Sequence, residues 1–389
     1  MDRIHPAIVI VGFNRTDALR RLLNSVGNAD YSGYSGIPLV ISIDKSGCDE
    51  VEKIATDFEW GYGSKRVIVH KQRLGLRSHV IECGDLTDEY SAVIILEDDL
   101  VVSPAFYDYA AQAIAFYKDE PEVSGISSYA DEFCGYVDMR FGAIEDGYDN
   151  YFMQMASSLG QIWNRAQWSK FRAWYDRHAR DGLSETDRLP RSVLKWPESS
   201  WKKYFIKYMV DQGFYFVYPR VSLATNFGDD GTHGKGTGNL LQVPMLMKKK
   251  AFSFSRVGES SSVYDAFFEP TQETLKKFCP QFKGFDFECD FYGMKELNKI
   301  KAEYLFSVKE AREPISRFGD RMVPLVNNVV FGIKGKSISF GRTREFGKLS
   351  RWSRLRMVYG QQRILNGMTA LALGCYRFLT LLKRIISRD

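Results

Sequence analysis

The most chemically suggestive stretch of the sequence is a run of three carboxylates, Glu97-Asp98-Asp99, between two apolar segments. Residues 93–96 have no polar alternation, which is typical of a strand buried on both faces of a parallel sheet. Burying unpaired charges there would cost several kcal/mol each, so we expect the carboxylates where the strand leaves the sheet. Carboxylate oxygens at such an edge suit Mg²⁺ or Mn²⁺ carrying phosphates of a ligand. The alternative is an acidic turn that simply ends a strand.

The residues before this triplet predict strands that alternate with helices. Apolar strands are predicted at 8–13, 38–43, 66–70 and 93–96, and helices at 18–26, at about 49–58 and after 74–77 as far as about 83. Such alternation indicates right-handed βαβ units and a parallel sheet. The predicted fold class is therefore α/β, with a Rossmann-like, mostly parallel sheet flanked by helices.

Each predicted strand is followed by polar residues. These are Asn14 and Arg15, then Asp44, then residues 70–77, then the triplet. No GxGxxG or GxxxxGK[ST] pattern follows the first strand, which argues against dinucleotide-binding and P-loop proteins. A nucleotide could bind across the four strand ends, with Asp44 accepting from a base N–H and Arg15 meeting a phosphate. Taken singly, Asp44 could be a turn residue and Arg15 a solvated helix-start residue, but the combination favours a ligand site.

Length and composition are those of a globular protein with one large or two unequal domains. The six cysteines lack paired spacing, which argues against a zinc site or a disulfide framework and fits a reducing compartment. The charged N-terminus has too short an apolar run for a signal peptide, and no stretch of about 18 apolar residues suggests a membrane-spanning helix. We therefore expect a cytoplasmic protein.

Basic charge is concentrated at the C-terminal end. Residues 332–389 contain 13 Lys and Arg against two acidic residues, whereas residues 1–331 contain 40 basic and 46 acidic residues. Nucleic-acid binding by the body is therefore not expected. Helical patterns at 295–310 and in 349–386, where glycines favour several short helices, predict a mostly helical basic extension. The basic amphipathic tail is typical of a peripheral anchor on the inner face of the membrane. The alternative is a helix packed on the body with a solvated basic face.

Two further segments have a composition that suggests ligand contacts. Residues 151–201 are rich in aromatic side chains, which could stack on sugars or fill a core. Residues 219–238 are dense in Gly, Asp and Thr and include His233 and Lys235, which could touch a pyrophosphate. This segment predicts a lid or a phosphate-binding loop, with a flexible surface linker as the alternative.

Six segments occur in an order that resembles a known family. They are VGFNR (11–15), SIDKSG (42–47), LGLRSHV (74–80), LEDDLVVSPAFYDY (96–109), SSLGQIW (157–163) and YPRVSLATNFGDDGTHG (218–234). Together they resemble inverting GT-A glycosyltransferases, in particular the N-acetylglucosaminyltransferase I type and its bacterial relatives in surface-polysaccharide synthesis. The resemblance covers roughly residues 8–238, and its most specific parts are the LEDDLVVSP and GDDGTHG segments.

The resemblance implies an organisation and a reaction. A GT-A catalytic domain would occupy 1–270, with a nucleotide-binding half at about 1–125, an acceptor half at about 126–270 and the extension at 271–389. The implied enzyme moves a hexose or N-acetylhexosamine from a UDP-sugar to a saccharide or lipid-linked saccharide acceptor, using Mn²⁺ or Mg²⁺. By this resemblance, Asp99 would bind the metal and Asp98 would lie near the ribose. Glu97 would lie near the donor sugar, and Asp44 would hold the uracil. The other residues expected to contact the donor are Arg15, Arg77, His233 and Lys235.

The family's catalytic base is an aspartate shortly before a Trp that opens a helix. Here that stretch is Trp196-Pro197-Glu198-Ser199-Ser200-Trp201, with no aspartate. Glu198 is the nearest carboxylate and is the predicted base. The departure leaves open a shifted alignment or altered catalysis. The alternative functions are a nucleotidyltransferase or other nucleotide-sugar enzyme, and a catalytically silent glycan-binding protein of the same fold.

Overall fold

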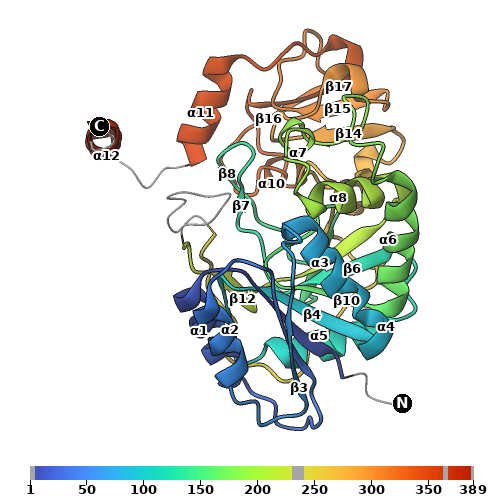
Figure 1. Ribbon diagram of the computed structural model, residues 1–389. Helices are drawn as coiled ribbons and strands as arrows, with labels where there is room; N and C mark the ends of the chain where they lie inside the picture. The colour runs from blue at the N-terminus through green and yellow to red at the C-terminus, as the bar shows by residue number, and fades with distance from the viewer. Residues whose placement is uncertain (1–4, 230–240, 362–366, 387–389) are drawn as a thin grey trace.

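The computed structural model describes residues 5–229, 241–361 and 367–386. In these residues the largest sheet has nine strands, in the order β13-β9-β11-β6-β10-β4-β1-β2-β3 (Figure 1). Five of its eight strand pairs are parallel. The predicted α/β class with a mostly parallel sheet is confirmed.

The N-terminal half is the predicted series of βαβ units. Its strands are β1 (Ala7–Gly12), β2 (Leu39–Ile43), β3 (Lys65–Val69) and β4 (Ala92–Glu97), and its helices are α1 (Thr16–Gly27), α2 (Asp49–Asp57), α3 (Leu76–Asp85) and α4 (Thr87–Tyr90). The four strands are parallel, so their carboxyl ends lie at one edge. Alternate residues of β1 enter two different core clusters, which explains why its sequence is apolar throughout.

The second half of the sheet extends this edge. It contains β6 (Val123–Ser127), β9 (Asn150–Met153), β10 (Gln161–Asn164), β11 (Tyr215–Pro219) and β13 (Val263–Tyr264), with helices α5 (Phe106–Phe116), α6 (Arg165–His178), α7 (Arg191–Leu194) and α8 (Trp201–Gln212). β10 is antiparallel to both β4 and β6. β4 and β6 therefore run in the same direction, and both end at the same edge of the sheet.

The apolar run around the acidic triplet is two strands in two sheets. β4 ends at Glu97, residues 98 and 99 form a turn, and β5 (Leu100–Val102) pairs with β12 (Ala224–Asn226) in a separate ribbon. Because the chain leaves the main sheet at this turn, the carboxylates lie where the strand ends, as predicted.

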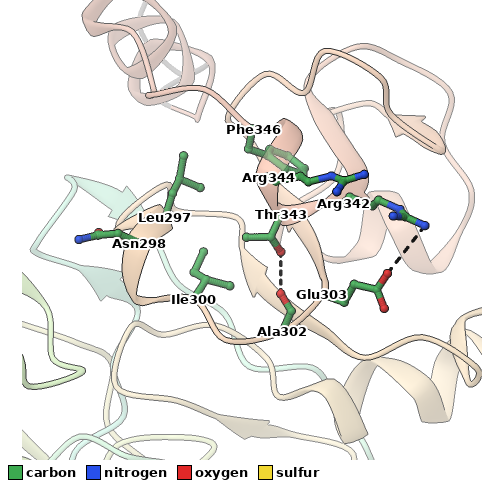
Figure 2. Close-up of a pocket in the computed structure, with 9 residues that line it drawn as sticks. All are labelled: Leu297, Asn298, Ile300, Ala302, Glu303, Arg342, Thr343, Arg344 and Phe346. Carbon is green, nitrogen blue, oxygen red and sulfur yellow. Dashed lines mark hydrogen bonds and ion pairs between the residues drawn. The ribbon is translucent and has the colours of Figure 1, made fainter.

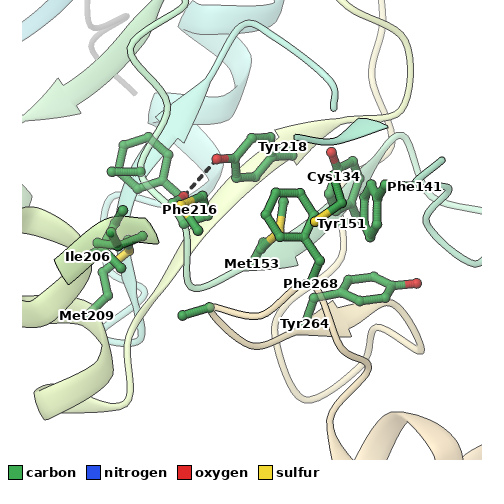
Figure 3. Packing of buried hydrophobic residues seen from close by; sticks show 14 of the residues in the cluster. Cys134, Phe141, Tyr151, Met153, Ile206, Met209, Phe216, Tyr218, Tyr264 and Phe268 are labelled. Atoms are coloured by element: carbon green, nitrogen blue, oxygen red, sulfur yellow. Dashed lines mark hydrogen bonds between the residues drawn. The ribbon is translucent and has the colours of Figure 1, made fainter. Parts of the chain in front are cut away.

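Most aromatic residues of segment 151–201 belong to the core. Phe152, Trp163, Trp168, Phe171 and Trp201 are each 2% exposed or less. Figure 3 shows the neighbouring rings of Phe141, Tyr151, Phe216, Tyr218, Tyr264 and Phe268, with the Tyr218 hydroxyl donating to the carbonyl of Met155 (2.7 Å). The core interpretation is therefore correct for these side chains, while Trp196 is only partly buried.

The extension after residue 270 is not mostly helical, which corrects the sequence prediction. Its centre is a sheet of β14 (Phe287–Asp290), β15 (Tyr304–Ser307), β17 (Ile338–Arg342) and β16 (Ser316–Phe318), in that order. The predicted helix at 295–310 is a 3₁₀ turn, Leu297–Lys299, followed by β15. Leu305 and Phe306 are both fully buried, on opposite faces of β15, which a helical stripe would not allow.

The extension also contains helices. They are α9 (Gln272–Phe278), α10 (Asn327–Val330), α11 (Arg351–Gln361) and α12 (Gly367–Ile386). The last two match the prediction that the tail forms separate helices, but α12 has 20 residues and continues through Gly374, so it is not short. Met357 and Val358 of α11 pack on the core, whereas α12 stands apart from the rest of the molecule in Figure 1. Among the described residues, no helix combines the length and apolar character needed to cross a bilayer.

The two sheets share one buried cluster. Phe287 and Phe306 of the smaller sheet belong to the same cluster as Tyr264 of the larger sheet and Phe268, which follows it. The domain boundary near residue 270 therefore stays a prediction.

Packing of α3 against α6 can be tested at Gly84. A Cβ added to Gly84 would lie 2.1 Å from Cζ2 of Trp168, whose indole N–H is fixed by Asp85 (2.7 Å). Gly84→Ala gains about 1 kcal/mol of helix propensity, but overpacking costs about 1–3 kcal/mol. We expect a lower urea midpoint by tryptophan fluorescence, with Gly61→Ala, where a Cβ meets nothing within 4 Å, as the control. An unchanged or higher midpoint for Gly84→Ala would contradict this packing.

Candidate active site

Arg15 forms ion pairs with two carboxylates of the triplet. Its guanidinium Nη2 donates to Asp98, and Nη1 donates to Oδ2 of Asp99 at 3.3 Å. The Arg15 side chain is 25% exposed, that of Asp98 5% and that of Asp99 21%. The structure thus brings together the ends of β1 and β4, and it leaves Asp99 the more accessible of the two paired acids.

The triplet is electrostatically strained. Burial raises the pKa of Glu97 to about 8, with Asp99 and Asp98 adding to the rise and Arg15 and Lys202 opposing it. Burial also raises the pKa of Asp98 to about 6, against the opposing charge of Arg15. Oε1 of Glu97 is buried and has no hydrogen-bond partner among the described residues. One arginine therefore does not offset three adjacent carboxylates, and a further cation would stabilise them.

The donor set fits a divalent cation that brings most of its own ligands. The described residues contain no preformed group of three or more metal-ligating side chains. Asp99 is part-exposed and uses one carboxylate oxygen for Arg15, so its other oxygen is available. Mg²⁺ and similar ions are commonly held by one or two carboxylates with waters and phosphates. Asp99 is therefore the residue that would hold the metal.

Asp44 fixes the loop that precedes α3. Its carboxylate accepts from the backbone N–H groups of Lys45 (2.8 Å), Leu74 (2.8 Å) and Gly75 (3.0 Å). Asp44 is 4% exposed and lies at the end of β2, as predicted. Two carboxylate oxygens offer about four acceptor positions, so one remains for a base N–H.

Arg77 and Glu198 meet each other on the side of α8. Nη1 of Arg77 donates to the Tyr204 hydroxyl (3.1 Å) and lies 3.7 Å from Oε2 of Glu198. Glu198 also accepts from the ammonium of Lys203 and from the Tyr204 hydroxyl. These hydrogen bonds lower the pKa of Glu198, whose side chain is 70% exposed. Both oxygens of Glu198 thus accept hydrogen bonds, and these bonds make it a weaker base.

The beginning of the predicted lid is attached to the triplet. The Phe227 N–H donates to the Asp99 carbonyl (2.9 Å), and Arg21 forms an ion pair with Asp229 while its guanidinium lies 3.6 Å from the Phe227 ring centroid. His233 and Lys235 lie outside the described residues. What the structure supports is that the segment leading to them starts next to Asp99.

The analysis of the sequence missed two charged residues at this edge, Asp131 and Lys202. Asp131 follows the end of β6, and Lys202 lies in the first turn of α8. Asp131 could have been found by the same strand-end argument, but Val-Ser-Gly-Ile-Ser is too polar to be recognised as a buried strand. Nothing in the sequence pattern distinguishes Lys202 from its neighbour Lys203.

A separate cavity of about 560 Å³ lies on the smaller sheet (Figure 2). Leu297, Ile300 and Phe346 form its apolar part. Arg342 and Arg344 at its rim lie 3.9 Å from Glu303 and 3.6 Å from Glu345, respectively. No residue of the triplet lines this cavity, so it is not part of the candidate active site.

The sequence was compared with protein families and with known proteins. No family model matches the chain. It is 26% identical over 246 residues to alpha-1,3-mannosyl-glycoprotein 2-beta-N-acetylglucosaminyltransferase of Arabidopsis thaliana, over 58% of this chain and 48% of that protein. The chain is similar to a glycosyltransferase. The resemblance inferred from the motifs is thus confirmed, and the chain spans about half the length of this relative.

Two solved structures have a partial likeness to the fold. One is GalNAc-T7 with UDP, GalNAc and Mn²⁺, at 15% identity, 57% coverage of this chain, 43% of that chain and a TM-score of 0.36. The other is the mannosyltransferase PcManGT of Pyrobaculum calidifontis with GDP-Man and Mn²⁺, at 12% identity, 59% coverage of each chain and a TM-score of 0.35.

Removing the Asp44 carboxylate should release the loop before α3. Asp44→Ala leaves the N–H groups of Lys45, Leu74 and Gly75 without their acceptor, at about 1–3 kcal/mol for a buried unsatisfied group. We expect faster tryptic cleavage at the exposed Lys71 and Arg73. Asp57→Ala, on the exposed end of α2, is the control and should cleave like the wild type. Equal cleavage rates for all three proteins would contradict the role of Asp44.

Proposed function

We propose that this protein is a metal-dependent glycosyltransferase that moves a sugar from a UDP-sugar to a saccharide acceptor with inversion at the anomeric carbon. The observation that carries the proposal is the acidic triplet at the sheet edge, part-neutralised by Arg15, in a chain similar to an N-acetylglucosaminyltransferase. A hexosyl or N-acetylhexosaminyl donor fits this similarity.

The proposed donor lies across the strand ends. The free acceptor position of Asp44 suits the uracil N–H, Asp98 and Glu97 suit the ribose and the donor sugar, and Asp99 holds Mn²⁺ or Mg²⁺. A bound divalent cation supplies positive charge that stabilises the departing diphosphate. Arg15 lies next to the same position and can add to this stabilisation once the cation takes over Asp99. Arg77, His233 and Lys235 stay predicted donor contacts.

The reaction also needs a base for the acceptor hydroxyl, for which Glu198 is the predicted residue. In a single displacement the base takes the hydroxyl proton, the oxygen attacks the anomeric carbon, and the bond to the nucleotide breaks on the opposite face. A nucleotidyltransferase that bound a nucleoside triphosphate at this site would instead release pyrophosphate. A silent glycan-binding protein would bind UDP without turnover. The product therefore separates the three functions.

The tail supports a peripheral membrane location. In α11, Trp352 is 82% exposed and Leu355 53% exposed, next to the exposed Arg351, Arg354 and Arg356. In α12, Met368 and Leu371 are also exposed. Exposed apolar side chains interleaved with arginines suit the interface of an anionic bilayer. We propose cytoplasmic-face attachment, with a lipid-linked saccharide acceptor in bacterial surface-polysaccharide synthesis.

The metal assignment predicts the behaviour of Asp99→Ala. Because Asp99 is the proposed metal ligand, the variant should lose Mn²⁺-dependent affinity for UDP by about tenfold or more, measured by calorimetry with and without Mn²⁺. Asp119→Ala removes a carboxylate that is 82% exposed and precedes β6, at the opposite end of the strands from the triplet, and it should bind like the wild type. Unchanged Mn²⁺-dependent affinity in Asp99→Ala would exclude this residue as the metal ligand.

The membrane assignment predicts binding to anionic vesicles. The triple variant Arg351→Gln, Arg354→Gln, Arg356→Gln removes three surface cations, each contributing about 1 kcal/mol near anionic lipid. We expect affinity for phosphatidylglycerol-containing vesicles to fall at least about tenfold in co-sedimentation. A matched control with the same charge change, Lys53→Gln, Lys195→Gln, Lys283→Gln, uses exposed lysines of the body. Equal losses in both variants, or no vesicle binding by the wild type, would contradict membrane attachment through the tail.

A further inference from the structure

Asp131 lies at the same sheet edge as the triplet. β6, which precedes it, runs parallel to β4, with β10 between them. The chain after β6 is hydrogen-bonded to the ribbon that follows the triplet. The Ser128 carbonyl accepts from the N–H groups of Leu223 (2.7 Å) and Ala224 (3.1 Å), and the Ala130 N–H donates to the Ser222 hydroxyl (2.6 Å). Because β12 pairs with β5, this ties the Asp131 segment to the strand directly after Asp99.

The carboxylate of Asp131 is available for a ligand. Its backbone N–H donates to the Tyr151 hydroxyl (3.2 Å), but its carboxylate has no hydrogen-bond or ion-pair partner in the described part of the chain. Lys202 likewise has no carboxylate within ion-pair distance among the described residues, and its Nζ lies 5.3 Å from the Trp196 ring centroid. Lys202 interacts electrostatically with both Asp131 and Glu97. This lysine is therefore electrostatically coupled both to the Asp131 carboxylate and to Glu97 of the triplet.

The surroundings of Asp131 and of Glu198 shift their pKa values in opposite directions. Burial raises the pKa of Asp131 to about 6, and Lys202 opposes the rise. Hydrogen bonds from Lys203 and Tyr204 lower the pKa of Glu198. A general base works best when its pKa is near the operating pH and when it has a free lone pair for the proton. Asp131 meets both conditions, whereas Glu198 has a lowered pKa and both of its carboxylate oxygens already accept hydrogen bonds.

We propose that Asp131 is the general base of the transfer reaction and that Lys202 is the residue that positions and holds it ionised. The inference rests on the proposed function. The Asp131 carboxylate takes the proton of the acceptor hydroxyl, whose oxygen forms the new bond to the anomeric carbon. The bond from that carbon to the diphosphate oxygen breaks, and its electron pair leaves with UDP. Glu198 then serves to join α8 to Arg77 at the start of α3.

Among its neighbours, Lys202 has the main effect on the ionisation of Asp131. The ionisable groups that face Asp131 are Lys202, Cys134, the exposed Glu132 and four tyrosines, Tyr129, Tyr136, Tyr151 and Tyr218. Burial raises the pKa of Cys134 and of all four tyrosines, so they stay neutral between pH 5 and 8. Lys202 is the basic group that remains, and it also interacts electrostatically with Glu97.

The test uses the full chain, Mn²⁺ and a panel of UDP-sugars with water as acceptor, scored by UDP release. Asp131→Asn should lower kcat on the order of 100-fold or more, while its affinity for UDP stays that of the wild type. Azide is already an anion and needs no base, so it should restore UDP release in Asp131→Asn and yield the glycosyl azide by mass spectrometry. Glu132→Gln makes the same kind of change one residue along, on an exposed side chain, and is the matched control.

The pH profile gives a second readout. UDP release should fall as the pH drops through about 6, because the base is then protonated. Lys202→Met removes the cation that favours the ionised form, so the acidic limb should move to higher pH. Glu198→Gln should keep the wild-type limb. Lys202→Met also keeps the inference testable if Asp131→Asn does not fold.

The outcomes separate two failures. Turnover by the wild type with an unchanged rate in Asp131→Asn, or azide rescue of Glu198→Gln instead, would overturn the assignment of Asp131 and leave the glycosyltransferase proposal standing. An acidic limb that does not move in Lys202→Met would exclude the coupling to Asp131. No UDP release by the wild type with water or azide would overturn both proposals.

Discussion

The site depends on a single electrostatic constraint: a parallel sheet has to end in three adjacent carboxylates, and one arginine does not neutralise them. Arg15 pairs with Asp98 and Asp99, but Glu97 keeps a buried oxygen without a partner in the described residues, and burial raises its pKa to about 8. A cation is stabilised at such an edge, because its positive charge reduces the repulsion between carboxylates that water solvates poorly. The excess of negative charge is therefore what prepares this edge for a metal and a diphosphate.

The other strand ends are held in place by hydrogen bonds from backbone N–H groups. Asp44 accepts from three backbone N–H groups and so sets the loop that starts α3. Phe227 donates its N–H to the Asp99 carbonyl, so the loop after β12 begins from the triplet itself. These contacts make the position of each strand end depend on its neighbours, which is how residues far apart in the sequence are held at hydrogen-bonding distances.

The sequence was sufficient for the first half of the fold and insufficient for the second. The strands β1, β2 and β4 are largely apolar and alternate with helices, so their pattern is unambiguous. In the extension, Leu305 and Phe306 belong to a strand buried on both faces, but the spacing of apolar residues such as Leu297 and Leu305 suggested a helix at 295–310. Tertiary packing decided between the two, and no local pattern could show it. For the site, the positions of Asp44 and the triplet were predictable from strand ends, whereas the partners of Glu198 were not.

The contrast between Glu198 and Asp131 shows why a base is difficult to assign from sequence alone. A carboxylate near a tryptophan that opens a helix has the right neighbours in the chain, but its basicity depends on neighbours in space. Lys203 is 2% exposed and has Glu198 as its anionic partner, so Glu198 is needed to compensate a buried ammonium. Protonating Glu198 would leave that ammonium uncompensated, and the carboxylate therefore resists taking a proton. Asp131 is in the opposite situation. Protonating it removes the cost of burying a negative charge and breaks no ion pair among the described residues. Two carboxylates on one edge are thus separated into a structural and a reactive one by what each would lose on protonation.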